Sequence, residues 1–167
     1  ATIIYSIALV SMLAASAAYH MAAHTPARPI LRRLDHAAIY LKIAGTFTPL
    51  SVLLGTAFGY FILTLVWILA LAGAVIKLMA ERGKMTTGWL PYAALGCTGM
   101  VLFIPLSAIL PTTSVALMLT GGLLYVAGVL FYCSESLRYA NAIWHSFVVV
   151  ASACSFFGIT SALASGM

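Results

Sequence analysis

The stretch AFGYFILTLVWILALAGAVIKLMA (residues 57–80) decides the fold class of this chain. Its one charged residue is Lys77, which lies near its end. A run of about 20 apolar residues is long enough to cross the hydrocarbon core of a bilayer as an α-helix. A membrane-spanning strand needs only about 10 residues and alternates apolar with polar positions, which this run does not do. The stretch therefore predicts a transmembrane helix.

The rest of the chain has the same character. Of its 167 residues, 63% are hydrophobic and 7% are charged, and the mean hydropathy is +1.11. Soluble domains carry about a quarter charged residues, so the composition excludes a soluble fold. Apolar runs between short polar breaks predict six transmembrane helices, at about residues 1–23, 31–54, 57–80, 88–108, 112–133 and 139–164. We therefore predict an all-α membrane protein, a polytopic helical bundle forming a single transmembrane domain over residues 1–167.

Prolines and the first residues refine this prediction. Pro49, Pro91 and Pro105 fall within or near predicted helices and are expected to kink them. Pro29 suits the first turn of the second helix, where no N–H is needed. The run at residues 1–23 shows neither the charged start nor the cleavage site of a signal peptide, so we expect it to be a membrane helix.

Lysines and arginines fix the predicted orientation. The basic residues of the five connections between predicted helices occur only in the first, third and fifth connections. They are Arg28, Arg32, Arg33, Arg82, Lys84 and Arg138. The positive-inside rule places these three connections in the cytoplasm. The net charge of +5 is thus a signal of topology and requires no nucleic-acid partner. We predict a multi-pass protein of the cell (plasma or inner) membrane.

Ionisable side chains recur at the cytoplasmic ends of three predicted helices. His20 lies near the end of the first helix, Asp35 in the first turns of the second, and His145 near the start of the last. Their common depth predicts a metal site or an acid–base set inside the bundle. Ser16 precedes His20 by four residues and Asn141 precedes His145 by four, so each shares a helix face with its histidine and can orient the imidazole.

Each of these residues also has a simpler interpretation. A single histidine near a helix end commonly hydrogen-bonds to solvent or to a carbonyl. Asp35 can pair with a neighbouring arginine in the first turns of its helix, and Ser16 can bond back to its own helix. His24 and His36 are interpreted as interfacial, since His36 lies about 100° around the helix from Asp35.

Lys42 lies two turns deeper than Asp35 on the same helix face. It can pair toward Asp35, extend to the interface, or line a polar cavity. The distance to the interface makes the second option difficult, so we favour a role for Lys42 inside the bundle.

Three blocks of the sequence resemble the hemolysin III family and the related progestin and adiponectin receptors. They are SAAYH (16–20), RLDHAAIYLKIAGTFTP (33–49) and NAIWHSFVVVASACSFFG (141–158), and their order and spacing match over essentially the whole chain. The resemblance implies a bundle of seven helices with a cytoplasmic N-terminus, of which this chain would show helices two to seven. It also implies a zinc ion near the cytoplasmic face, held by three histidines.

The resemblance assigns most of that site to residues of this chain. His20 and His145 match two of the three histidines, and Asp35 and Ser16 match the acid and the hydroxyl beside the metal. Asn141 stands where the receptors have the third histidine, and an amide oxygen is a poor zinc ligand. We therefore expect His20, His145 and Asp35 to hold the zinc, with water in the fourth position.

Three functions are compatible with such a site. The relation to the receptors and to alkaline ceramidases implies a zinc-dependent amidohydrolase acting on a lipid, with Asp35 as ligand or base and Ser16 as partner of an oxyanion or water. The alternative is a receptor- or sensor-like protein in which the metal is structural. A pore-forming cytolysin is the third, although beyond Lys42 the sequence offers few charged residues for a conducting path.

Overall fold

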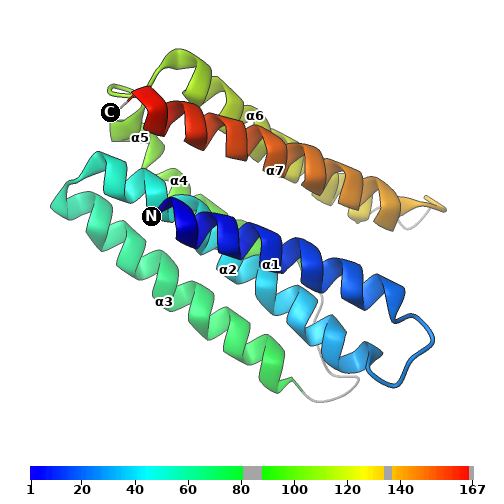
Figure 1. The fold of residues 1–167 in the computed structure, drawn as a ribbon. Helices are drawn as coiled ribbons and strands as arrows, with labels where there is room; N and C mark the ends of the chain where they lie inside the picture. Colours follow the sequence, from blue (N-terminus) through cyan, green and yellow to red (C-terminus); the bar gives the residue numbers. More distant parts are fainter. Residues whose placement is uncertain (81–87, 134–136, 166–167) are drawn as a thin grey trace. The chain divides into compact units, whose positions relative to one another are not determined.

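The computed structural model describes residues 1–80, 88–133 and 137–165, which form helices joined by short turns (Figure 1). The helices are α1 (Thr2–Met21), α2 (Arg28–Leu54), α3 (Ala57–Met79), α4 (Leu90–Met100), α5 (Phe103–Leu106), α6 (Thr112–Tyr132) and α7 (Ala140–Ser165). Within the described ranges, α1, α2, α3, α6 and α7 are long and apolar enough to cross a membrane. The prediction of an all-α, polytopic membrane protein is confirmed. The basic residues Arg82 and Lys84 lie outside the described residues.

The five long helices lie close to their predicted positions. The largest difference is at α2, which begins at Arg28 instead of residue 31 and has Pro29 in its first turn, as expected. Proline is favoured there because the first N–H groups of a helix have no partner within it. Pro49 lies inside α2, which continues through it to Leu54.

The structure corrects the helix predicted over residues 88–108. The segment is divided into α4 and α5, with a turn at Val101 and Leu102 between them. Pro105 explains the break, because it has no N–H to donate to the carbonyl of Val101 and its ring would clash with that carbonyl in a continuous helix. The N–H of Leu102 instead bonds to the carbonyl of Gly99 at 3.0 Å. The sequence predicts a kink at Pro105, whereas the structure has a break between α4 and α5.

The chain forms two compact units. The first, Ala1–Leu102, contains α1 to α4, and the second, Phe103–Met167, contains α5 to α7. In the first unit α2 is central, because α1 and α3 both pack along it and α4 contacts α2 and α3. A Cβ atom built on Gly45 of α2 would lie 2.8 Å from the Cβ of Ala8 in α1. The ring of Phe47, also on α2, fills the space beside Gly99 of α4.

A tight turn joins α2 to α3. Gly55 ends α2 with a φ of 62°, a left-handed conformation that glycine adopts without steric cost. Its N–H bonds to the carbonyl of Ser51 at 3.1 Å. Thr56 then caps α3, since its hydroxyl accepts the N–H of Gly59 at 3.1 Å. The two helices are therefore antiparallel neighbours.

In the second unit α6 and α7 pack closely along their length. A Cβ atom built on Gly121 of α6 would lie 2.9 Å from the carbonyl oxygen of Ala151 in α7. Small residues let the backbones of two membrane helices approach in this way. The hydroxyl groups of Tyr125 and Ser152, 2.6 Å apart, join the same two helices.

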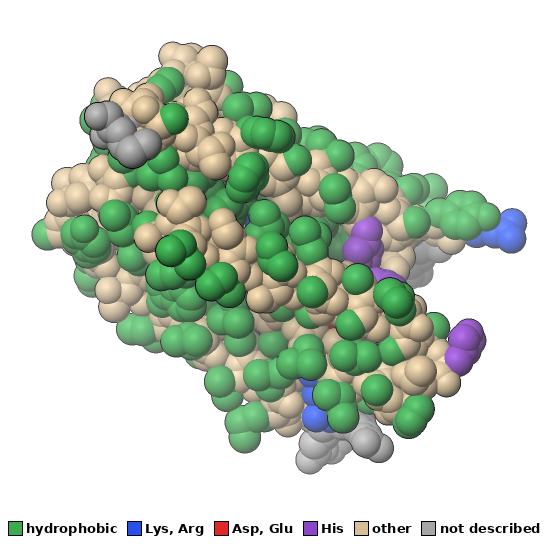
Figure 2. Space-filling model, viewed as in Figure 1, with side chains coloured by type: hydrophobic (Ala, Val, Ile, Leu, Met, Phe, Trp, Pro, Cys, Tyr) green, Lys and Arg blue, Asp and Glu red, His purple; other side chains and the backbone are tan. Residues whose placement is uncertain are grey.

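Large apolar side chains cover the outer faces of the helices (Figure 2). On α3, for example, the exposed fractions of Phe61, Ile68 and Ile76 are 66%, 60% and 67%. Such contiguous apolar surface is unfavourable in water and marks a membrane contact. The helices are embedded in the lipid bilayer through these faces.

Candidate functional site

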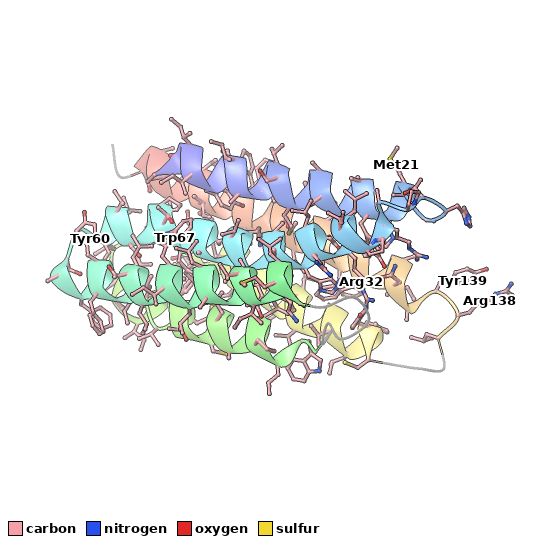
Figure 3. The ribbon with its side chains drawn as sticks, turned by 90° about the horizontal axis from the view of Figure 1, so that it is seen from below. Met21, Arg32, Tyr60, Trp67, Arg138 and Tyr139 are labelled. Atoms are coloured by element: carbon pink, nitrogen blue, oxygen red, sulfur yellow. The ribbon has the colours of Figure 1, made fainter. Side chains whose placement is uncertain are left out.

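Two of the predicted site residues lie on α1. His20 is the last residue but one of this helix and is exposed, with its ring 4.8 Å from the ring of Tyr19. Ser16, one turn earlier, is half-buried. Figure 3 marks this end of α1 by Met21. The exposure of His20 differs from the expectation of a buried site.

The packing of α1 on α2 places Asp35 at the level of these two residues. Ala8 touches Gly45, and the two helices are antiparallel because the short turn at residues 22–27 joins them (Figure 1). Counting ten residues forward from Ala8 gives Ala18 on α1, and counting ten residues back from Gly45 gives Asp35 on α2. Because the helices are antiparallel, Ala18 and Asp35 lie at the same level. Asp35 is therefore within about 3 Å, along the helix axes, of both Ser16 and His20. Asp35 is half-buried as a residue.

Lys42 lies deeper in the first unit. Only 4% of the residue is exposed, and its main-chain carbonyl accepts the hydroxyl of Thr46 at 2.8 Å. Burying an ammonium group away from water is unfavourable unless other groups compensate for its charge. The proposed role of Lys42 inside the bundle stays a prediction.

The remaining site residues lie at the start of α7, in the second unit. The Nδ1 atom of His145 is 2.7 Å from the main-chain carbonyl oxygen of Asn141. A carbonyl can only accept, so Nδ1 carries the proton and donates it. The lone pair of the neutral ring is then on Nε2, the nitrogen that metals commonly bind when Nδ1 is held by a carbonyl. The main chain of Asn141, not its amide group, makes this contact.

The candidate zinc ligands are divided between the two units. His20 and Asp35 belong to the first and His145 to the second. Within residues 1–80, 88–133 and 137–165, no group of three His, Cys, Asp or Glu side chains is close enough to hold a metal ion. Imidazole nitrogens and a carboxylate oxygen are nonetheless the donors that zinc prefers, so the residue types fit the metal. Their convergence on one ion stays a prediction.

The structure contains a further group of polar side chains that the sequence does not predict. His36, for which the sequence predicts an interfacial position, is half-buried, and its Nδ1 atom lies 3.2 Å from the hydroxyl of Tyr92 in α4. The ammonium group of Lys77 in α3 lies 5.7 Å from the centre of the same tyrosine ring. The one signal in the sequence is the four-residue spacing of Arg32, His36 and Tyr40, which puts all three on one face of α2.

Comparison with known proteins identifies the family. The family described as haemolysin-III related matches residues 1–156. The chain is 36% identical over 156 residues to a hemolysin-3 homolog of Bacillus subtilis (strain 168), covering 92% of this chain and 73% of the relative. It is 35% identical over 155 residues to the hemolysin-3 of Bacillus cereus, covering 92% and 71%. No solved structure is significantly similar. The resemblance inferred from the three sequence blocks is confirmed, and the chain belongs to the haemolysin-III related family.

Proposed function

We propose that this chain is a zinc-dependent hydrolase that cleaves a lipid amide at the cytoplasmic side of the cell membrane. The proposed ligands are His20, Asp35 and His145. The observation that carries the proposal is the 2.7 Å hydrogen bond from Nδ1 of His145 to the carbonyl of Asn141. It fixes the ring and its tautomer, as the supporting groups of metal-bound histidines do.

The packing of the first unit adds support. Ser16, His20 and Asp35 share one level of the α1–α2 pair, so an imidazole, a carboxylate and a hydroxyl belong to residues at a single depth. A set of this kind provides two ligands of the type zinc prefers and one neutral hydrogen-bond donor.

The side chains have distinct proposed roles. When bound, zinc supplies a Lewis acid that polarises a carbonyl and acidifies water. Asp35 acts either as a ligand or, through water, as a general base that accepts a proton. The hydroxyl of Ser16 donates a hydrogen bond to the oxygen on which negative charge develops. The carbonyl of Asn141 keeps the ring of His145 in one orientation.

Metal content of the purified protein tests the site. The wild type, purified without chelators, is expected to contain about one zinc ion per chain by inductively coupled plasma mass spectrometry. His20→Ala and His145→Ala are expected to lose most of it. His24→Ala is the matched control, because this exposed histidine lies in the α1–α2 turn and should leave the zinc content unchanged. A purified wild type that contains much less than one zinc ion per chain would contradict the proposal.

A receptor- or sensor-like protein with a structural metal is the second candidate. In this role the metal would bridge α1, α2 and α7, the helices that carry His20, Asp35 and His145. Chelation should lower the melting temperature under either function. Release of fatty acid from a lipid amide by the zinc-loaded wild type, lost in Asp35→Asn, is expected only of the hydrolase. Stable zinc binding with no such hydrolysis would favour the structural role.

A further inference from the structure

Two side chains beside His20 have no role in the proposed function. Tyr19 precedes His20 on α1, and Arg28 is the first residue of α2, across the short α1–α2 turn (Figure 1). The ring centres of Tyr19 and His20 lie 4.8 Å apart, and the planes of the two rings are inclined by 57°. The guanidinium carbon of Arg28 lies 5.7 Å from the centre of the tyrosine ring. Tyr19 therefore contacts both a proposed zinc ligand and a cation.

The contact between the two rings does not follow from helix geometry. Side chains of successive residues on an α-helix point about 100° apart, so the rings of Tyr19 and His20 meet because their side chains lean toward each other. Their separation of 4.8 Å and their tilt lie within the range that aromatic pairs favour, about 4.5–7 Å between ring centres. Tyr19 is half-buried and His20 is exposed, so the better-packed ring supports the more exposed one.

Hydrogen bonds in the α1–α2 turn place Arg28 beside Tyr19. The N–H of Ala22 donates to the carbonyl of Ala18 at 3.1 Å and extends the last turn of α1. The hydroxyl and the N–H of Thr25 both donate to the carbonyl of Ala22, each at 3.1 Å. The N–H of Arg28 donates to the carbonyl of Thr25 at 3.2 Å. The guanidinium group is within range of a cation–π interaction, which limits the movement of the Tyr19 ring.

An exposed metal ligand benefits from a contact of this kind. An imidazole in solvent has several rotamers, and a metal ion selects one of them, so the freedom lost on binding lowers the affinity. A ring that is already held in the binding orientation loses less freedom. The ring of His145 is oriented by a main-chain carbonyl, whereas His20 has the aromatic ring of Tyr19 among its contacts.

We propose that Tyr19, itself held by Arg28, is a positioning residue that keeps the imidazole of His20 in the orientation that binds zinc. The inference rests on the proposed zinc site, but the ring contact is present without the metal. It requires the aromatic ring of residue 19 and not its hydroxyl group. A tyrosine that only anchors a helix end at the membrane interface would have no effect on His20.

NMR spectra of histidine-labelled protein in detergent test the contact without metal. With a chelator present, the ring-proton signals of His20 are identified by their loss in His20→Ala. They are expected to shift in Tyr19→Leu, because the ring current of residue 19 is removed. They should stay near their wild-type positions in Tyr19→Phe, which keeps an aromatic ring. Arg28→Gln is expected to shift them less, since it removes only one contact of the tyrosine ring.

Zinc affinity, measured by competition with a chromophoric chelator, tests the positioning. Tyr19→Leu is expected to weaken zinc binding about three- to tenfold, and Tyr19→Phe should retain the wild-type affinity. Tyr60→Leu is the matched control, because Tyr60 is 47% exposed near the start of α3, at the opposite end of the first unit. It removes a tyrosine from the other end of the helices and should leave the zinc affinity unchanged.

Three results would overturn the proposal. The first is a set of His20 signals that does not shift in Tyr19→Leu, and the second is equal zinc affinity in the wild type and Tyr19→Leu. The third is an equal loss of affinity in Tyr19→Leu and Tyr60→Leu, since the effect would then come from anchoring in the membrane. A wild type that binds no zinc contradicts the proposed function instead, and the spectra with chelator then decide alone whether Tyr19 orients His20.

Discussion

The main chain of residue 141, not its side chain, orients His145. The carbonyl oxygen that accepts the Nδ1 proton is present whatever amino acid stands at this position. The side chain of residue 141 can therefore be exchanged while the imidazole keeps its tautomer and orientation. It precedes His145 by one helical turn, so a ligand placed there shares the face of α7 that carries His145.

Asn141→His is predicted to tighten zinc binding about tenfold or more, because it adds a third imidazole at a position whose amide is not one of the proposed ligands. Competition with a chromophoric zinc chelator measures the change. Asn141→Ala is the companion variant, and it should bind zinc as the wild type does because the carbonyl remains. Equal affinity in all three proteins would show that residue 141 does not face the metal.

The level shared by Ser16, His20 and Asp35 could be anticipated from the sequence. It depends only on the rise of two helices joined by a short turn. The contact of His36 with Tyr92 could not be anticipated, because the placement and rotation of α4 against α2 are set by packing. The same limit applies to His145, which lies in the other unit, and its convergence with His20 and Asp35 stays a prediction.

At the scale of helices, hydrophobic length predicted the five long helices, whereas the effect of proline depended on its neighbours. Pro49 lies in the most enclosed part of α2, which has α1 on one side and α3 on the other and stays continuous. Pro105 lies in α5, and the helix is interrupted one turn earlier, at Val101 and Leu102. A proline removes one hydrogen bond in either case, and surrounding contacts decide whether the helix survives the loss.

Close packing of α6 on α7 predicts opposite results for two adjacent glycines. A Cβ atom on Gly121 would lie 2.9 Å from both the carbonyl oxygen of Ala151 and the hydroxyl of Ser155, whereas one on Gly122 would meet no atom within 4 Å. Gly121→Ala should therefore reduce the free energy of unfolding by about 1–3 kcal/mol. Gly122→Ala should be neutral or slightly stabilising, because alanine has the higher helix propensity. Thermal unfolding in detergent compares them, and equal melting temperatures would contradict the packing described.

For the whole molecule, charge asymmetry between the connections predicts which side of the membrane the proposed metal site faces. Arg28 and Arg138 lie in connections predicted to be cytoplasmic, and the tight turn at Gly55 and Thr56 carries no lysine or arginine. The proposed metal site lies toward ends of helices that adjoin these basic connections. Its predicted orientation therefore depends on one topological rule.

Cysteine labelling of intact cells is predicted to confirm this topology. In a chain whose three native cysteines are replaced by alanine, Ala57→Cys should react with a membrane-impermeant maleimide, because it adjoins the α2–α3 turn on the outer side. Ala27→Cys, in the α1–α2 turn, should react only after the membrane is permeabilised. Both positions are exposed at the ends of helices, so differences in burial would not produce this contrast. The reverse pattern would place His20 and Asp35 at the outer face, where the proposed site would hydrolyse lipids of the opposite leaflet.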